Sequence, residues 1–231
     1  VKIIDGGNVR MGDLAFISAR KVNGVSALHT DLMKRTVFRD LHALHPDRIV
    51  NQTNGVTPRR WLAGCNPALA SLLTEAVGHG WETDLEQLKV IAPLADDAGF
   101  RTRFSKAKQT NKDLLTKYLK AKLDITVDPT AMFDIQIKRI HEYKRQFLNI
   151  IEAIALYNQI RAHPEKNWTP RVKIFAGKAA ASYDVAKLII KLACDVAKMV
   201  NADPTVRGKL KIVFLENYNV SLAEMIIPAT D

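Results

Sequence analysis

The sequence predicts an α/β fold built on a doubly wound parallel sheet with helices on both faces. Short β-prone segments at residues 133–137, 172–176 and 210–215 alternate with helical patterns at 146–161, 182–201 and 221–227. Strands that alternate with helices of this length need right-handed crossovers, which produce a parallel sheet covered on both faces. The chain has 231 residues, 47% of them hydrophobic, which is enough to bury a substantial core.

The segments before the first of these strands are predicted to be mainly helical. Residues 8–38 carry apolar side chains at spacings of three and four, which suit two helices interrupted at Asn23-Gly24. Asn-Gly, Thr-Pro and Asn-Pro pairs mark residues 51–67 as a loop-rich crossing with a short helix after Pro58. Further helices are predicted at 67–73, 81–94 and 98–123, the last of them long and highly charged.

The change of composition at the loop-rich crossing predicts two domains. Residues 1–52 would form the helical end of one domain, and residues 53–231 the first part of a second. Three predicted strands are fewer than the roughly five or six of an average sheet, and the final residues carry no helix stop signal. We therefore expect the sequence to be an internal part of a longer protein.

Composition argues against membrane, secreted and metal-binding proteins. No run of about 18 uncharged apolar residues occurs and the first residues lack a secretory signal, so we expect a soluble cytosolic protein without membrane association. Cys65 and Cys194 lie far apart, in apolar surroundings and in no CxxC or Cys/His pattern. We expect two buried, reduced thiols, no disulfide and no metal site.

A formal net charge of +10 would suit a protein that binds nucleic acid. The cations are scattered, however, through helical patterns such as residues 101–122, where Asp and apolar residues separate them. The chain has neither a basic tail nor the aromatic pattern of an RNA-binding module. Solvated basic helix faces explain the charge, and no nucleic-acid partner is predicted.

The octet KRIHEYKR at residues 138–145 is the strongest functional signal. It places four fixed cations between a predicted buried strand and a predicted helix. Ligands of open α/β sheets bind beyond the carboxyl ends of the strands, so cations there predict a phosphate site. Backbone amides at the start of the helix would add donors for an anion. The alternative is a basic helix start that is simply solvated.

Polar residues also follow the other two predicted strands, so three loops would converge on one crevice. Gly177 and Lys178 follow the second strand, ahead of a Ser182 suited to capping the next helix, and residues 216–219 follow the third. No GxGxxG or P-loop motif occurs, so classical NAD or ATP binding is not predicted.

The cations of the octet differ in what they can hold. Arg139 offers a planar, bidentate donor, whereas Lys138 and Lys144 are compact point charges. Together they could neutralise two phosphate groups held close to each other.

Several long motifs, in this order, resemble the α-glucan phosphorylases, which act on glycogen, starch or maltodextrin. The motifs are NGVTPRRW at residues 54–61, FDIQIKRIHEYKRQ at 133–146, GKAA at 177–180, and the segment from Asn217-Tyr218 to IPATD at 227–231. The segment VNGVSALHTDLM at residues 22–33 is similar to the bacterial glycogen phosphorylase type. The resemblance covers essentially the whole chain.

This resemblance implies a GT-B glycosyltransferase fold. Residues 1–52 would be the C-terminal end of the N-terminal phosphorylase domain, and residues 53–231 the first part of the C-terminal Rossmann-like domain. The implied reaction is phosphorolysis of α-1,4-glucan by inorganic phosphate to give glucose 1-phosphate. The implied cofactor is pyridoxal 5′-phosphate, whose phosphate group exchanges a proton with the substrate phosphate.

The resemblance also implies catalytic and cofactor roles for individual residues. Lys138 and Lys144 would serve the cofactor phosphate, with Lys144 also near the substrate phosphate. Arg139 would hold the substrate phosphate, and Trp61 and Tyr218 would lie against the cofactor.

Two further residues are implied to contact the substrate sugar. Asn54 and Tyr143 would lie near the bound glucose. The lysine that attaches the cofactor in this family would lie outside the chain, beyond Asp231. We therefore expect the 231 residues alone to be inactive.

A cytoplasmic homodimer is the family's expected form for the full-length protein. The sequence indicates neither the preferred glucan nor any allosteric regulation. A non-catalytic module for glucan binding or assembly is the alternative function, and it predicts carbohydrate binding without the cofactor.

Overall fold

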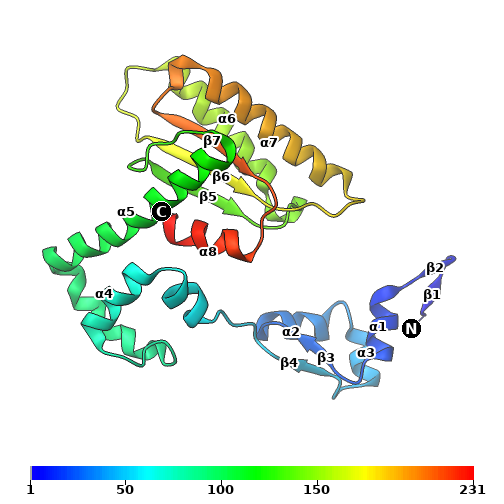
Figure 1. Ribbon diagram of the computed structural model, residues 1–231. Coiled ribbons are helices and arrows are strands. Elements are labelled where there is room, and N and C mark those ends of the chain that lie inside the picture. The colour runs from blue at the N-terminus through cyan, green and yellow to red at the C-terminus, as the bar shows by residue number, and fades with distance from the viewer. Residues whose placement is uncertain (1) are drawn as a thin grey trace. The chain divides into compact units, whose positions relative to one another are not determined.

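The computed structural model describes residues 2–231. The chain divides into two compact units, Val1–Thr57 and Pro58–Asp231, and each is described by itself (Figure 1).

The first unit combines short helices with two small sheets. Its helices are α1 (Met11–Ser18), α2 (Ala27–Arg35) and α3 (Arg39–Leu44). Strands β1 (Ile4–Asp5) and β2 (Asn8–Val9) pair antiparallel, whereas β3 (Val22–Gly24) and β4 (Ile49–Asn51) pair parallel. Phe16, Leu41 and Ile49 form its small buried core.

The segment before residue 53 was predicted to be helical, and it forms helices α1 to α3, but the short strands β1 to β4 were not predicted. Helices α1 and α2 lie on either side of Asn23-Gly24, as predicted, but these two residues belong to β3, which pairs with β4 in the register Gly24↔Asn51. A Cβ atom on Gly24 would lie 2.0 Å from Thr30 Oγ1, so this glycine lets α2 pack closely on the strand. Tertiary pairing and this close approach therefore override the local turn signal.

The second unit begins with helices. A single π-helical turn, Arg59–Gly64, follows Pro58 and leads into α4 (Pro67–Val77). A 3-10 segment (Leu85–Asp96) replaces the predicted helix at 81–94, and α5 (Ala98–Leu123) has the predicted bounds. Asp97 caps the start of α5, and Asp124 ends it in the left-handed conformation with φ 55°.

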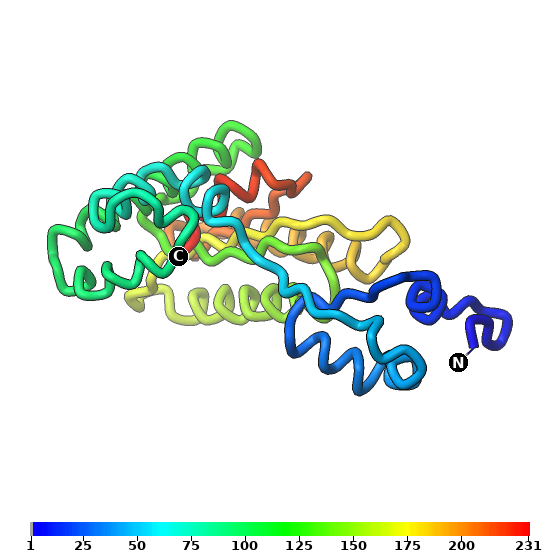
Figure 2. The backbone as a smooth tube through the Cα atoms, turned by 90° about the horizontal axis from the view of Figure 1, so that it is seen from below, coloured from blue at the N-terminus to red at the C-terminus, as the bar shows by residue number. Residues whose placement is uncertain are grey.

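The predicted parallel sheet is confirmed. Strands β5 (Met132–Ile137), β6 (Arg171–Ala176) and β7 (Leu210–Leu215) lie in that order, and both pairs are parallel. Helices α6 (Gln146–Ala162) and α7 (Asp184–Ala202) contribute with the sheet to one core, whereas α5 and α8 (Val220–Ala229) contribute to the core on its other face. Figure 2 shows α6, in yellow-green, running alongside the strands.

Side-chain alternation along β6 explains how one strand serves both cores. Val172 and Ile174 belong to the core with α5 and α8, whereas Phe175 belongs to the core with α6 and α7. Residues one apart on a strand point to opposite faces. This central strand is therefore buried on both sides, as in other parallel sheets, although it contains Arg171 and Lys173.

Helix α8 leads the chain from β7 back toward β5. It crosses the face opposite α6 and α7 and brings the chain back to β5 (Figure 1). There Asp231 N donates to Phe133 O at 3.2 Å, and Phe133 N donates to the Asp231 carboxylate at 2.8 Å. The chain thus first builds outward from β5 to β7 and then returns to the free edge of β5. Open α/β sheets bind ligands beyond the carboxyl ends of strands whose connections leave to opposite faces.

The cysteines lie in different surroundings from those predicted. Both are free, but Cys65 is only half-buried and Cys194 is exposed. Cys194 follows the buried Ala193 on α7 and lies on the solvent side of that helix. The prediction of two buried thiols is therefore wrong for Cys194. Across residues 2–231, none of the helices is long and apolar enough to cross a membrane.

Candidate functional site

The register of the sheet brings three polar loops to one edge. Ile137, Ala176 and Leu215, the last residues of the three strands, are direct neighbours across the sheet. The loops that follow them therefore start side by side, with Lys138 after β5 and Lys178 after β6, both exposed.

Main-chain hydrogen bonds hold the first loop across the end of β6. Lys138 N donates to Ala176 O, and Ile140 N donates to Lys178 O, each at 3.1 Å. Ile140 is buried, whereas Lys138 and Arg139 are exposed. A Cβ atom on Gly177 would lie 2.1 Å from Lys138 O, so only glycine allows this crossing. The backbone of this loop is fixed while its cations reach solvent.

Gln146, which was not predicted from the sequence, holds the same loop by hydrogen bonds from its buried side chain. Only 1% of Gln146 is exposed. Its Nε2 donates to Arg139 O at 3.1 Å, and its Oε1 accepts from His141 N at 3.4 Å. A polar residue at a buried helix position was the available signal, because such a residue needs hydrogen-bond partners.

The next part of the octet forms a tight turn before α6. Glu142–Lys144 is a 3-10 turn, and Arg145 follows in the left-handed conformation with φ 60° and ψ 32°. A non-glycine residue in this conformation costs roughly 1–2 kcal/mol, so its surroundings must hold it there. Lys144 is half-buried, and its Nζ lies 5.5 Å from the centre of the Tyr143 ring.

Aromatic contacts hold the exposed side of this turn. Tyr143 is 70% exposed, but its ring lies 4.3 Å, between centroids, from that of His141. The centroid of the Tyr183 ring lies 5.1 Å from that of His141, and the Tyr183 hydroxyl donates to the Glu142 carboxylate. That hydrogen bond raises the pKa of Tyr183. Tyr143 is thereby held with most of its ring open to solvent.

Ser182 does not cap α7. Tyr183 occupies the N-cap position instead, and no side-chain hydrogen bond caps the helix. The prediction of a Ser182 cap is therefore wrong, because the helix begins one residue later than the pattern suggested.

Most of the cations at this edge are not neutralised by carboxylates. Within residues 2–231, no carboxylate forms an ion pair with Lys138, Arg139, Lys144 or Lys178. Clustered charges of one sign at the end of a sheet raise the local concentration of an anion. The edge can therefore hold an oxyanion such as phosphate.

Helix α8 connects the segments that contain Trp61 and Tyr218. Trp61 is half-buried in the turn Arg59–Gly64, and Arg60 Nε lies 3.3 Å from Glu224 Oε1 on α8. Tyr218 lies just before α8 and packs partly buried against the core below it. Burial raises the pKa of Tyr218.

Asn54 belongs to the first unit. It is exposed, and its backbone N–H donates to Val25 O at 2.9 Å. The structure places the other six predicted site residues in the second unit.

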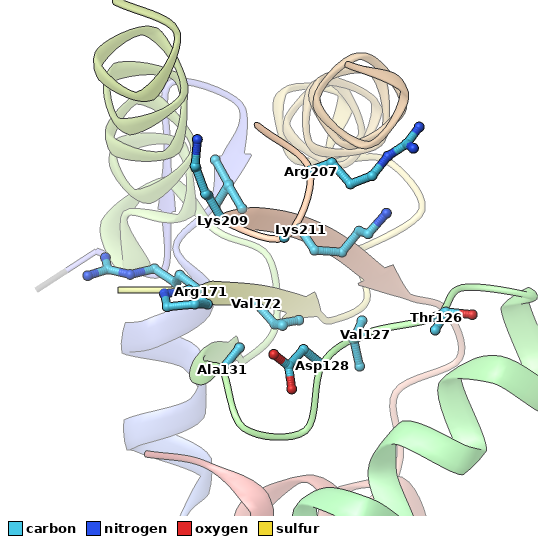
Figure 3. Close-up of a pocket in the computed structure, with 12 residues that line it drawn as sticks. Thr126, Val127, Asp128, Ala131, Arg171, Val172, Arg207, Lys209 and Lys211 are labelled. Atoms are coloured by element: carbon cyan, nitrogen blue, oxygen red, sulfur yellow. The ribbon is translucent and has the colours of Figure 1, made fainter. Parts of the chain in front are cut away.

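A cavity of about 320 Å³ lies at the opposite, amino edge of the sheet (Figure 3). Its basic lining residues diverge: Arg171 extends to one side of the view, and Arg207 and Lys211 extend to the other. Arg171 is already paired with two carboxylates, and Lys209 donates to Pro164 O. This cavity is not a convergent anion site. Over residues 2–231, no group of three or more His, Cys, Asp or Glu residues could hold a metal ion.

Comparison with known proteins identifies relatives along the entire chain. A family model described as carbohydrate phosphorylase matches residues 1–231. Glycogen phosphorylase of Haemophilus influenzae is 47% identical over 100% of this chain, which covers 28% of that protein. The human liver form is 48% identical over 96% of the chain and the Synechocystis enzyme 47% over 97%, and the chain covers 26% of each. The chain therefore spans about a quarter of the length of these curated relatives.

Proposed function

The chain belongs to the carbohydrate phosphorylase family, and from that premise we propose that the protein containing it is a glycosyltransferase that phosphorolyses α-1,4-glucan. Inorganic phosphate would take the terminal glucosyl unit and release glucose 1-phosphate. The observation that carries this proposal is the group of cations Lys138, Arg139 and Lys144 at the carboxyl edge of the sheet, which form no ion pair within residues 2–231. A phosphate substrate needs such a group.

Arg139 is the proposed partner of the substrate phosphate. Its guanidinium group is exposed and can donate two parallel hydrogen bonds to a phosphate. Gln146 supports this role, because it fixes the carbonyl of Arg139 and so the start of the side chain. The exposed Tyr143 is the proposed glucan contact of the second unit, because its hydroxyl suits sugar hydroxyls. Asn54 of the first unit is proposed separately as a glucan contact, because its amide can also bind sugar hydroxyls.

The residues at this edge fit the phosphate of pyridoxal 5′-phosphate. Lys138 and Lys144 are unpaired within residues 2–231, and two ammonium groups suit the phosphate of a cofactor. Trp61 and Tyr218 are half-buried amphipathic side chains that could lie against the ring. When bound, the cofactor would supply a phosphate group able to exchange a proton with the substrate phosphate.

The cations would allow two phosphates to lie close together. Two unit charges about 5 Å apart repel by about 3 kcal/mol at an effective dielectric constant of about 20. Lys144, placed near both groups, would offset this repulsion. Nearby positive charge also favours the ionised form of a phosphate and lowers its pKa. The cations would thereby ease release of the proton from the phosphate that they contact.

We also propose the domain organisation and assembly that the family suggests. Residues 1–52 would close an N-terminal domain of the GT-B fold, residues 53–231 would begin the C-terminal one, and the full protein would form a homodimer.

The test uses the full-length protein. Glycogen and inorganic phosphate are supplied, glucose 1-phosphate is measured, and bound pyridoxal phosphate is measured by its absorbance. The proposal predicts both product and cofactor. A protein that binds glucan but contains no cofactor and releases no glucose 1-phosphate would instead be a non-catalytic module.

A further inference from the structure

A buried lysine lies beneath α6 and is not one of the residues proposed to bind phosphate. The Lys173 side chain is 3% exposed, and its Nζ lies 2.9 Å from Asp134 Oδ2 and 2.5 Å from Glu152 Oε2. The same ammonium donates to Asn149 Oδ1 at 2.7 Å. An ammonium group has three donors and no acceptor, so these three partners satisfy it completely.

The charges in this cluster balance. Arg171 Nη1 lies 3.4 Å from Asp134 and 3.5 Å from Glu152, so two cations share two carboxylates. Ion pairs whose charges balance can be kept beneath a helix, whereas removing one partner leaves an uncompensated charge. The third partner of Lys173, the neutral Asn149, is not needed for charge balance.

Asn149 starts a relay of hydrogen bonds toward the carboxyl edge of the sheet. Its Nδ2 donates to Gln136 Oε1 at 3.0 Å, and Gln136 Nε2 donates to Lys144 O at 2.9 Å. Both ends determine the direction of the relay, because the ammonium can only donate and the carbonyl can only accept. Neither amide can turn over without placing like groups together.

The relay ends at the most constrained point of the octet. Lys144 N donates to His141 O, and Arg145 N donates to Glu142 O, so the turn closes on itself before the left-handed Arg145. The bond from Gln136 ties this turn to the sheet. It fixes the main chain of Lys144 and therefore the point from which its side chain extends.

We infer that Lys173, through Asn149 and Gln136, is a positioning residue for Lys144, an inference that rests on the proposed phosphate function of Lys144. The ammonium of Lys173 touches no reacting group. It orients the side-chain amides of Asn149 and Gln136. These amides hold the turn at residues 142–144, and the turn determines where the Lys144 side chain starts.

The variant that tests the relay most sharply is Gln136→Glu, because it has the same shape but cannot donate to Lys144 O. A matched control is Gln109→Glu. Gln109 Nε2 also donates to a main-chain carbonyl, Pro129 O, at 3.2 Å, and to Asp113 Oδ1 at 2.9 Å, and it lies far from the octet in the sequence. Both changes replace an amide by a carboxylate beside a carbonyl. Only Gln136→Glu should disturb the turn.

The experiment uses the full-length protein and three measurements. The first is the KM for inorganic phosphate and the second is the Kd for pyridoxal phosphate added to the cofactor-free protein. The third is amide hydrogen exchange of peptides that cover residues 142–147. For Gln136→Glu we expect KM and Kd to rise about fivefold to tenfold, the size of one lost hydrogen bond, with faster exchange in the turn. For Gln109→Glu we expect all three to stay at wild-type values.

A second variant tests the role of the lysine itself. Lys173→Met should raise the same KM and Kd, and combining it with Gln136→Glu should add little, because both changes break one relay. Fully additive effects, or unchanged exchange at residues 142–147 in Gln136→Glu, would overturn the inference. If the wild-type protein shows no phosphorolysis, the proposed function fails, while the exchange measurement still decides whether the relay holds the turn.

Discussion

Gly177→Ala should damage the phosphate site through the backbone alone. The new methyl group would lie 2.1 Å from Lys138 O and 2.8 Å from Ile140 Cδ1. Non-bonded carbon contacts are normally about 3.5–4.0 Å, so the carbonyl of Lys138 must move by roughly 1 Å or more. Because Lys138 N and Ile140 N each donate across this crossing, the displacement would stretch both bonds.

The expected magnitude follows from this displacement. Overpacking at a buried position costs about 1–3 kcal/mol of folding free energy. A shift of about 1 Å in groups that position the substrate can reduce the catalytic rate about 100-fold. Lys138 and Arg139 belong to the backbone segment that would be displaced. We therefore expect both a lower urea midpoint and a much lower kcat/KM for phosphate.

The assay compares Gly177→Ala with Gly12→Ala in the full-length protein. A Cβ atom on Gly12 would lie 3.7 Å from Phe38 Cε1, an ordinary contact, and Gly12 lies in α1. That control should be neutral or stabilise by up to about 1 kcal/mol. Unchanged stability and unchanged phosphate kinetics in Gly177→Ala would refute the close crossing at the end of β6.

Three further predictions concern the supports of the fold. Tyr157→Phe removes the 2.7 Å hydrogen bond to Asp203, the main cause of that carboxyl's lowered pKa. Stability should fall, and the pKa of Asp203 should rise on NMR titration; an unchanged pKa would contradict this. Burial would raise the pKa of Asp231, but hydrogen bonds from a lysine and a backbone N–H and nearby lysine charges lower it overall. Its carboxylate therefore stabilises the fold above about pH 4 and loses this effect as pH falls through the lowered pKa. Unfolding curves of wild type and Asp231→Asn should differ at neutral pH and converge in acid, and curves that diverge in acid would be inconsistent with this sign. The pair Arg60–Glu224 is partly exposed, so a double-mutant cycle should give a coupling below about 1 kcal/mol, and a larger value would show that the pair is more than a surface contact.

The sequence predicted the sheet and its covering helices well because their signals are local. The long helix α5 and the strand β7 have the predicted bounds, since periodicity and apolar runs determine them. The position of the octet at the carboxyl edge followed from its place after β5.

The remaining features depend on contacts between residues far apart in the sequence. Strand β3 exists because it pairs with β4, whose partner residues lie 27 positions later, and its Asn23-Gly24 looks locally like a turn. The role of Gln146 depends on the carbonyl of Arg139, and nothing in the local pattern shows that contact. The left-handed Arg145 was equally hidden, because a tertiary framework rather than residue type holds it.

The central claim is that cations at the carboxyl edge of the sheet bind the phosphate substrate, and one comparison tests it most directly. Phosphorolysis of glycogen by the full-length protein is measured as a function of phosphate concentration for Arg139→Gln and Arg207→Gln. Arg207 is an exposed arginine like Arg139, but it lies at the amino edge of the sheet. We predict that Arg139→Gln lowers kcat/KM for phosphate at least about 100-fold, as loss of a bidentate charged contact in a transition state can, and that Arg207→Gln leaves it unchanged. Equal effects of the two changes, or wild-type kinetics in Arg139→Gln, would contradict the claim.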